Sequence, residues 1–410
     1  MSFRPAFPGE SNNVSYTFQY YHDANLVDVI SNIISAGLKL GDHSRADVNY
    51  LVDAITGASR KDIHGSQIGP DGISGASIKS TPLDGIMSAS LTSEKRRQVT
   101  GTFSYNRDFI KMLFNGGTDN DDPATLSLTG INSEENDYTS RTAAASVSQD
   151  LFQRNTTTAF SFSRSFDKYR PEARYVPVTA NEGWDYFGDG KRLTDHFDAV
   201  LTQGITTTTV ISLLAGYTYD RGYLSRPYYT YKIGNIYYHE NLPAQHQSYT
   251  LTGKINQYIP LLKGCALHGT YRYYEDSWKM KSHTVEMELY SRIFDHIVLR
   301  PQLRWYKQNA AFFYQDVYTV PLQYMTTDFK YRSSNALSEG LKLSWELNDF
   351  VKPEGVPFFG IYPVSFDIGL DCYQRSGTRD WQVRNSHYNY WNVDKGFSSY
   401  WIQSGITGIF

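Results

Sequence analysis

The sequence predicts an all-β fold, a transmembrane antiparallel β-barrel of about 16 strands that residues 1–410 form as a single outer-membrane domain. Three observations carry this prediction. Apolar and polar side chains alternate over segments of about ten residues, as in strands that face lipid on one side and a lumen on the other. Short and long connections alternate between these segments. Aromatic residues make up 15% of a chain whose mean hydropathy is -0.47, an unusual combination for a globular enzyme.

The composition argues against several other classes. Thirty-three tyrosines and seven tryptophans suit bilayer interfaces, while no run approaches the ~18 consecutive apolar residues that a membrane helix requires. The formal net charge is -3 and charges of both signs are interleaved, which leaves no basic field for nucleic acid. Only Cys265 and Cys372 are present, so neither a disulfide framework nor a zinc cluster of the CxxC type can form.

The alternating segments give the expected strands in chain order. In the segment 283–293, for example, Val285 and Met287 occupy one face while Glu286 and Glu288 occupy the other. One face is therefore suited to lipid and the other to a polar lumen. The same alternation predicts strands over 14–28 (a hairpin pair running on to 40), 47–56, 97–107, 124–133, 141–151, 156–167, 193–204, 209–222, 247–259, 265–276, 283–293, 297–309, 328–347, 364–375 and 399–410.

The connections between these strands fall into two sets. The turn-sized ones are Gly41–Arg45, Phe152–Asn155, Gly204–Thr208, Leu261–Gly264 and Phe294–His296. The long polar ones lie around 57–93, 168–191, 225–245, 312–325 and 376–396. Because outer-membrane barrels have short periplasmic turns and long extracellular loops, we expect the long set outside the cell. An even strand number then places both termini in the periplasm of a bacterial outer-membrane protein.

Two connections have particular expected roles. Residues 57–93 form a long extracellular loop that we expect to fold into the lumen, because the segment is rich in glycine and serine with a modest apolar content. Residues 348–363 form a periplasmic connection, although this segment, like 107–124, is long for a tight turn.

Charged side chains fall on the inward parity of the strands between 265 and 376. The residues expected to line the lumen are Arg272, Glu286, Glu288, Arg292, Arg300, Arg304, Lys342, Glu346, Asp367, Asp371 and Arg375. Two interpretations remain open. Facing rows of opposite charge can select ions or small polar solutes, or the pairs can close on one another and rigidify the wall.

One pairing follows directly from this parity. Arg300 and Arg304 should face Glu286 and Glu288 on the adjacent strand, because opposite charges across a hairpin favour each other by ~0.2–1 kcal/mol.

The two cysteines should face lipid on strands about four apart, well beyond the ~7 Å over which a disulfide can bridge. We therefore expect both thiols to be free.

The carboxyl end resembles the signal by which the barrel-assembly machinery recognises outer-membrane barrels. Its residues on one face of the last strand are Tyr400, Ile402, Ile406 and Phe410.

Two acidic segments, 133–137 and 119–122, could bind Ca²⁺ through carboxylates, but neither has EF-hand spacing and solvated turns are favoured. Of the ten histidines, His268 points inward by parity, and six others fall in loops or at strand edges: His22, His64, His239, His246, His283 and His387. No G-x-S-x-G elbow, H-E-x-x-H or phosphate loop is present, so no enzyme activity and no cofactor are expected.

Three stretches carry a resemblance to a known family: Leu51–Ser59, Ser133–Tyr138 and Asp150–Thr157. They are similar to an uncharacterised family of bacterial outer-membrane β-barrels, domain of unknown function 3570. Arg60 stands where that family's pattern suggests proline after Gly-Ala-Ser. The resemblance implies a role in the cell envelope, together with a redox-linked system, because members are encoded beside thioredoxin-like and flavin-transfer proteins.

Two functional hypotheses follow from the sequence. The first is a pore or gated conduit for small polar solutes or ions. The alternative is a non-conducting scaffold that docks periplasmic or surface partners of an envelope redox system, such as a periplasmic lipoprotein or a thioredoxin-like protein. Outer-membrane lipid and lipopolysaccharide are expected partners in either case, and nucleic acid is not.

Overall fold

In the computed structural model of the protein the described residues are 12–23, 28–57, 60–61, 67–68, 82–83, 86–87, 92–106, 124–170, 174–176, 183–185, 190–225, 230–233, 236–260, 264–315, 318–326, 328–347, 362–376 and 397–409. Within these ranges no helix is long and apolar enough to cross a membrane.

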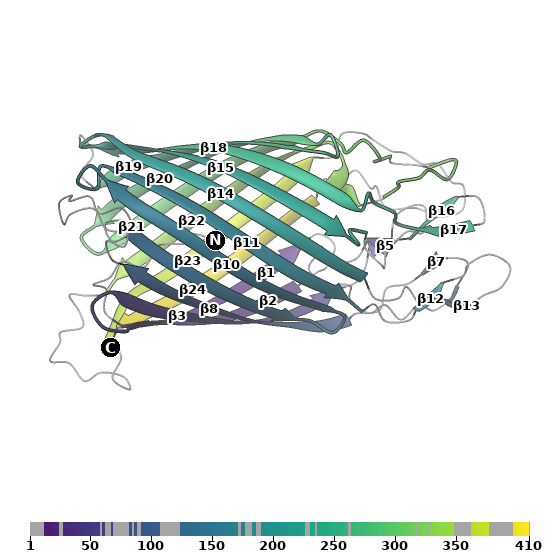
Figure 1. Cartoon of the computed structure of the whole chain (residues 1–410), viewed down its shortest axis with the longest axis horizontal. Coiled ribbons are helices and arrows are strands. Elements are labelled where there is room, and N and C mark those ends of the chain that lie inside the picture. The colour runs from purple at the N-terminus through teal and green to yellow at the C-terminus, as the bar shows by residue number, and fades with distance from the viewer. Residues whose placement is uncertain are drawn as a thin grey trace, which may run out of the picture.

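Sixteen antiparallel strands close into a barrel (Figure 1). They are β1 (Asn13–Asp23), β2 (Asp28–Lys39), β3 (Ser44–Gly57), β8 (Thr92–Asn106), β9 (Ala124–Glu134), β10 (Tyr138–Leu151), β11 (Thr156–Tyr169), β14 (Gly190–Thr206), β15 (Thr209–Gly222), β18 (Gln245–Ile259), β19 (Cys265–Asp276), β20 (Lys281–Phe294), β21 (Ile297–Gln308), β22 (Ser334–Glu346), β23 (Tyr362–Ser376) and β24 (Phe397–Ile409). Short strands pair within the connections: β4 (Arg60–Lys61) with β5 (Gln67–Ile68), β6 (Pro82–Leu83) with β7 (Ile86–Met87), β12 (Arg174–Val176) with β13 (Gly183–Asp185), and β16 (Thr230–Ile233) with β17 (Ile236–His239).

The first and last strands join to close the barrel. β1 pairs with β24 from Asn13 opposite Ile409 to Asp23 opposite Ser399. Closure gives every strand two neighbours, which removes the unpaired edge that lipid cannot solvate. The predicted fold class, a transmembrane antiparallel barrel of 16 strands, is confirmed.

Two expected strand boundaries are wrong. The strand expected from residue 328 begins at Ser334, because Phe329–Tyr331 form a 3-10 turn in which the Lys330 amide donates to the Asp328 carboxylate at 3.0 Å. β8 begins at Thr92 rather than at 97, since its first residues pair with the end of β3. This extension was not predicted, because the residues at the start of β8 are mostly charged and do not alternate with apolar ones.

The outer face of the barrel carries an apolar belt. On β18 the outward Tyr249, Leu251 and Ile255 are exposed, with Leu251 at 56%. At the edge of the belt nearer the loops, four aromatic rings form a continuous row, which we call the aromatic girdle: Phe162, Phe197, Tyr217 and Tyr249. Their ring centroids lie 4.7, 6.3 and 5.0 Å apart in that order. Outer-membrane barrels place such rings at the boundary between hydrocarbon and headgroups.

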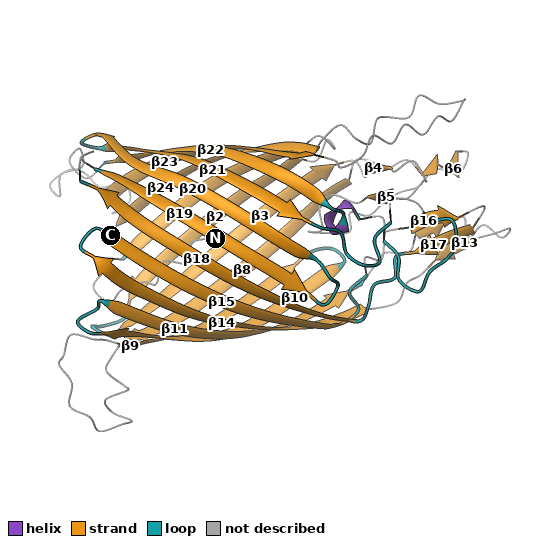
Figure 2. Cartoon of the chain, turned by 90° about the horizontal axis from the view of Figure 1, so that it is seen from above, coloured by secondary structure: helices purple, strands orange, loops and turns teal. Residues whose placement is uncertain are grey.

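The two ends of the barrel differ. Short turns join strands at one end, including the turn after β10, where Phe152, Gln153 and Arg154 adopt left-handed φ angles of 53°, 57° and 64°. The described chain ends, Asn13 and Ile409, lie at this same end. The short strand pairs of the connections lie at the other end (Figure 2). All five connections expected to be turn-sized join consecutive barrel strands at the short-turn end.

Candidate functional site

The charged residues that the sequence assigns to the lumen come from five neighbouring strands. β19 carries Arg272; β20 carries Glu286, Glu288 and Arg292; β21 carries Arg300 and Arg304; β22 carries Lys342 and Glu346; and β23 carries Asp367, Asp371 and Arg375. The residues between them, such as Met287, Leu303 and Leu341, are exposed on the outer face. Alternation therefore places the charged side chains together on one inner wall.

Six of these residues form a cluster that we call the charged wall: Glu286, Glu288, Arg300, Arg304, Lys342 and Asp367. The Arg304 Nε lies 3.9 Å from the Glu286 Oε2, and the Arg300 Nη1 lies 4.0 Å from the Glu288 Oε1. The expected facing of these two rows is confirmed.

The charged wall continues from β21 to β23 through Asp367. The Asp367 Oδ1 lies 3.8 Å from the Arg300 Nη2 and 3.5 Å from the Lys342 Nζ. The hydroxyl of Ser344 links them, because it accepts from Arg300 at 3.1 Å and donates to Asp367. All four of these ion pairs are longer than charge-assisted hydrogen bonds of ~2.7–2.9 Å, so the charged groups keep capacity to contact a solute.

The other predicted lumen residues lie apart from this cluster. Arg292 and Glu346 form a bidentate pair, 2.8 and 2.9 Å long, at the short-turn end. Arg375 lies at the loop end of β23. Asp371 lies against Gly340, where a Cβ would stand 2.2 Å from the carboxylate Oδ1. Arg272 lines a pocket nearer the loops, which Arg304 of the charged wall also borders.

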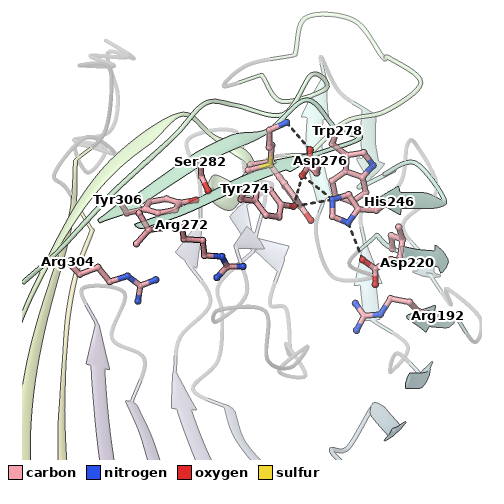
Figure 3. A pocket seen from close by; sticks show the side chains of 14 residues that line it. Arg192, Asp220, His246, Arg272, Tyr274, Asp276, Trp278, Ser282, Arg304 and Tyr306 are labelled. Atoms are coloured by element: carbon pink, nitrogen blue, oxygen red, sulfur yellow. Dashed lines mark hydrogen bonds and ion pairs between the residues drawn. The ribbon is translucent and has the colours of Figure 1, made fainter. Parts of the chain in front are cut away.

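This loop-side pocket has a volume of about 380 Å³ and is lined by inward residues of β14 to β21. Its polar lining includes Arg192, Arg272 and Arg304, with Trp278 and Tyr331 on the apolar side. Figure 3 shows the guanidinium groups of Arg272 and Arg304 pointing into the same space. Arg192 is held by Asp167 at 2.5 Å, whereas Arg272 has no hydrogen bond or ion pair with any other described residue.

His246 lies at one side of the pocket between two carboxylates. Its Nδ1 lies 3.1 Å from the Asp220 Oδ2, and its Nε2 lies 3.0 Å from the Asp276 Oδ2. The Trp278 ring packs against the imidazole at a centroid distance of 4.2 Å. His246 precedes Tyr249 of the girdle and so lies outside the membrane-spanning part of β18. Burial alone would lower the pKa of His246, but the hydrogen bonds to Asp220 and Asp276 outweigh it and raise the pKa to about 9.

This arrangement is structural rather than catalytic. Both ring nitrogens are engaged by carboxylates, so the imidazolium has no free lone pair with which to act as a general base. Among the described residues, no group of three or more His, Cys, Asp or Glu side chains could hold a metal ion. The sequence argument placed His246 in loops or at strand edges and missed the site. The parity it shares with Thr250 and Thr252 could have revealed it.

Residues 309–333, which we call the mouth loop, cover the pocket from the loop side and are described apart from 316, 317 and 327. Phe313 packs its ring edge-on against Trp278 at 5.2 Å. The Ala311 amide donates to the Tyr331 carbonyl and the Phe312 amide to the Trp278 carbonyl, both at 2.9 Å. With Leu242 and Met280 these residues form the largest buried apolar cluster described, and it lies at the barrel mouth rather than inside the lumen.

The opposite side of the lumen is lined by hydroxyl groups. β9 and β21 are the fifth and thirteenth of the 16 strands in barrel order, so they face each other across the lumen. Hydroxyl pairs join neighbouring strands there: Thr102 with Thr129 at 2.9 Å, Ser104 with Ser127 at 2.9 Å, and Thr142 with Ser165 at 2.7 Å. This hydroxyl wall was not predicted from the sequence, although serine and threonine alternate with apolar residues through 125–129.

Several other sequence expectations can now be placed. Tyr400, Ile402 and Ile406 are exposed on the outer face of β24, whereas Phe410 lies outside the described residues. The expected infolding of 57–93 also lies largely outside them, as do 107–123, with its acidic segment 119–122, and 348–361. The other acidic segment, 133–137, includes the short turn between β9 and β10 at the loop end.

The remaining histidine and cysteine expectations fall within the described strands. The His268 ring stacks on Tyr290 at 6.2 Å. Cys265 on β19 and Cys372 on β23 are both free, and three strands separate them in the barrel.

Comparison with known proteins gives one sequence family. The family described as "Protein of unknown function (DUF3570)" matches residues 5–378. No curated protein matches the chain.

Solved barrels resemble the structure at low identity. The siderophore receptor PirA from Acinetobacter baumannii has 9% identity and a TM-score of 0.44, covering 98% of this chain and 61% of its own. A mutant ferric enterobactin receptor from Pseudomonas aeruginosa has 8% identity and a TM-score of 0.42, covering 90% and 54%. OpdQ from Pseudomonas aeruginosa has 8% identity and a TM-score of 0.40, covering 97% and 98%. The chain thus spans little more than half the length of the two receptors.

Proposed function

Since the chain belongs to the DUF3570 family, whose function is unknown, we propose from its own geometry that it is an outer-membrane conduit for small polar solutes or ions. The observation that carries the proposal is the pair of facing lumen walls, one charged and one lined by hydroxyl groups. We place the long loops outside the cell and both termini in the periplasm, as is usual for barrels with one end of short turns.

The two walls act together on a passing solute. Charges of both signs on the charged wall create a field across the lumen, and the hydroxyl wall offers donors and acceptors of hydrogen bonds. A dipolar or hydroxylated solute can exchange its water for these groups, whereas an apolar solute gains nothing. The mouth loop narrows access to this path from the loop side, so solutes pass the loop-side pocket first.

The main test is the ion selectivity of the purified barrel in planar bilayers. The charged wall has three acidic and three basic side chains. Replacing Arg300 and Arg304 with glutamate leaves one cation among these six positions, so the reversal potential in a salt gradient should shift toward cation preference. Lys281→Glu with Lys307→Glu, which changes the same number of charges on the outer face, is the matched control.

The outcomes separate the hypotheses. A shift in the lumen variant alone supports the conduit. Stable currents with an unchanged reversal potential would place the path elsewhere in the lumen. A wild-type barrel that gives neither currents nor solute uptake in liposomes would reject the conduit. The redox partners implied by the family resemblance remain a separate prediction.

A second test concerns the loop-side pocket. We propose that the Arg272 guanidinium, which has no ion-pair partner among the described residues, meets anionic solutes at the mouth. Arg272→Gln should therefore slow liposome swelling with sodium gluconate more than with glucose. Equal slowing of both would give the arginine a steric role only.

A further inference from the structure

The outer face of the barrel carries an uneven distribution of charge near its loop end. Six strands, β8, β9, β10, β11, β14 and β15, follow one another in the barrel. Seven basic side chains lie at outward-facing positions of these strands, all of them outside β9. We call this set the basic rim: Lys95, Arg97, Arg141, Arg164, Lys168, Lys191 and Arg221. Two carboxylates, Glu134 and Asp195, share the surface. The surface therefore has a net positive charge of five.

The level of the basic rim is fixed by the strand register. Phe162 pairs with Phe197 and Phe197 with Tyr217, which is the line of the aromatic girdle. The next outward row toward the loops pairs Arg164 with Asp195. The basic rim thus begins one outward position beyond the girdle, where lipid headgroups rather than hydrocarbon meet the protein.

Two of the arginines are held in fixed positions. The Asp195 carboxylate accepts hydrogen bonds from the Arg164 Nε at 2.5 Å and the Arg164 Nη2 at 2.9 Å. It also accepts one from the Arg221 Nη2 at 3.3 Å. The Arg164 guanidinium lies 5.9 Å from the centre of the Phe162 ring, and that of Arg221 lies 5.4 Å from the Tyr219 ring. One carboxylate between two guanidiniums leaves an ordered excess positive charge at the surface.

Four of the other cations have no ion-pair partner among the described residues. Lys95, Arg97, Arg141 and Lys191 are exposed and make no ion pair with another described residue. Lys191 also lies directly opposite Lys168 on the same face. Two lysines directly opposite each other on neighbouring strands concentrate positive charge at this point of the rim.

The described residues of β19 to β22 carry no such excess. On β19 to β22 the outward charged residues near the loop end are Lys281, Lys307, Glu275 and Glu339, which sum to zero. Lys281 is paired with Glu275 at 3.0 Å. Among the described strands compared, a net positive charge at headgroup level is therefore found on β8 to β15 and not on β19 to β22.

We propose that the basic rim binds the phosphate groups of lipopolysaccharide in the outer leaflet. The proposal rests on the orientation given with the proposed function, in which the loop end faces the cell exterior. Phosphorylated sugar headgroups place several anionic groups at this level, and arginine and lysine in a row recognise them by charge-assisted hydrogen bonds. The girdle rings beneath the rim contact the acyl chains of the same lipid.

The test is lipid binding by the purified full-length barrel in detergent, measured by native mass spectrometry. The variant Lys95→Gln, Arg97→Gln, Arg141→Gln, Lys191→Gln leaves the Asp195 network intact. Its apparent affinity for lipopolysaccharide should fall about tenfold or more, because each cation near an anionic lipid surface contributes to binding. The matched control, Lys281→Gln with Lys307→Gln, should bind as the wild type does.

Further arms identify the ligand group. Lipid A with both phosphates removed should bind the wild type as weakly as lipopolysaccharide binds the quadruple variant, and inorganic phosphate should not compete at millimolar concentration. Phosphatidylglycerol binding as tightly as lipopolysaccharide would overturn the proposal in favour of a general contact with anionic lipid. Equal loss in the control variant would also overturn it. Ion selectivity should stay unchanged in the quadruple variant, so this result is independent of the conduit test.

Discussion

Gly340 determines where one lumen carboxylate lies. A Cβ at this position would stand 2.2 Å from the Asp371 Oδ1, so the carboxylate occupies the space that glycine leaves open. Gly369 lies on the inward face of the next strand, opposite Lys342, and a Cβ there would have no atom nearer than 3.9 Å. Gly340 is therefore retained for side-chain space, since its φ is not in the left-handed region.

We predict that Gly340→Ala displaces the Asp371 carboxylate and alters single-channel conductance, because the carboxylate can swing away without unfolding the strand. Gly369→Ala adds the same methyl group where space exists and should leave conductance as in the wild type. Recording both variants in planar bilayers checks the prediction. If the two variants behave alike, the position of Asp371 has no bearing on the path.

His246 gives a prediction about pH. Its pKa is raised from 6.5 to about 9 in the folded protein, so its contribution to stability is complete below about pH 6.5 and is lost as the pH rises through about 9. The groups that face it are Asp220 on β15, Asp276 and Tyr274 on β19, and the Trp278 ring.

Titration of the imidazole by NMR should therefore give a midpoint near 9 for His246 in the wild type. Asp276→Asn removes one of the two carboxylates and should bring the midpoint down toward 6.5. A wild-type midpoint at or below 6.5 would show that burial outweighs the carboxylates.

At the level of elements, the mouth loop depends on one buried hydroxyl. The Tyr318 hydroxyl lies 2.7 Å from the Phe313 carbonyl and 3.0 Å from the Thr326 carbonyl, and it accepts the Thr326 amide at 3.0 Å. Removing it leaves buried backbone groups without this partner, at a cost of ~1–3 kcal/mol. The rest of the barrel has no part in these bonds.

We predict that Tyr318→Phe loosens the mouth loop without unfolding the barrel. Limited proteolysis should cleave within 309–333 faster than in the wild type, while the heat-resistant migration of the barrel on gels stays the same. Tyr324→Phe, whose hydroxyl accepts a bond only from the exposed Gln323 side chain among the described contacts, is the control. Equal protease resistance of wild type and Tyr318→Phe would contradict the prediction.

At the level of the whole molecule, stability depends on which face of the strands meets lipid. Ile255 is exposed on the outer face of β18, three outward positions inside the apolar belt from Tyr249 of the girdle, whereas Gln247 lies outward on the same strand beyond the girdle. A charged side chain on the lipid face costs most near the bilayer centre and little near the headgroups.

Ile255→Arg should therefore lower the free energy of unfolding by ~2–4 kcal/mol in urea titrations from lipid vesicles, and Gln247→Arg by ~0–1 kcal/mol. Equal costs for the two variants would mean that the belt does not follow the level of the girdle. The first of these two variants should also insert into the membrane less efficiently than the second, because insertion brings the same outward side chains into the bilayer.

The fold could be predicted from the sequence because a barrel strand is a local pattern. The alternation in 283–293 and the short turn after it fix the strand, its two faces and its neighbour, and hence the pairing of Arg304 with Glu286. The role of Asp328 was not predicted, because a single carboxylate that caps a turn leaves no periodic signal in the sequence.

The site depended on contacts between strands that lie far apart in the sequence. Alternation along the chain is enough to assign side chains to the lumen, because inward and outward positions alternate with a period of two along every strand. The contacts between inward residues depend instead on how the strands pair. His246 reaches Asp220 and Asp276 from two flanking strands, and closure of the barrel sets the hydroxyl wall opposite the charged one. The period of two shows on which face of its strand a residue lies. Its level along the barrel axis and its neighbours depend on the register and the closure of all 16 strands.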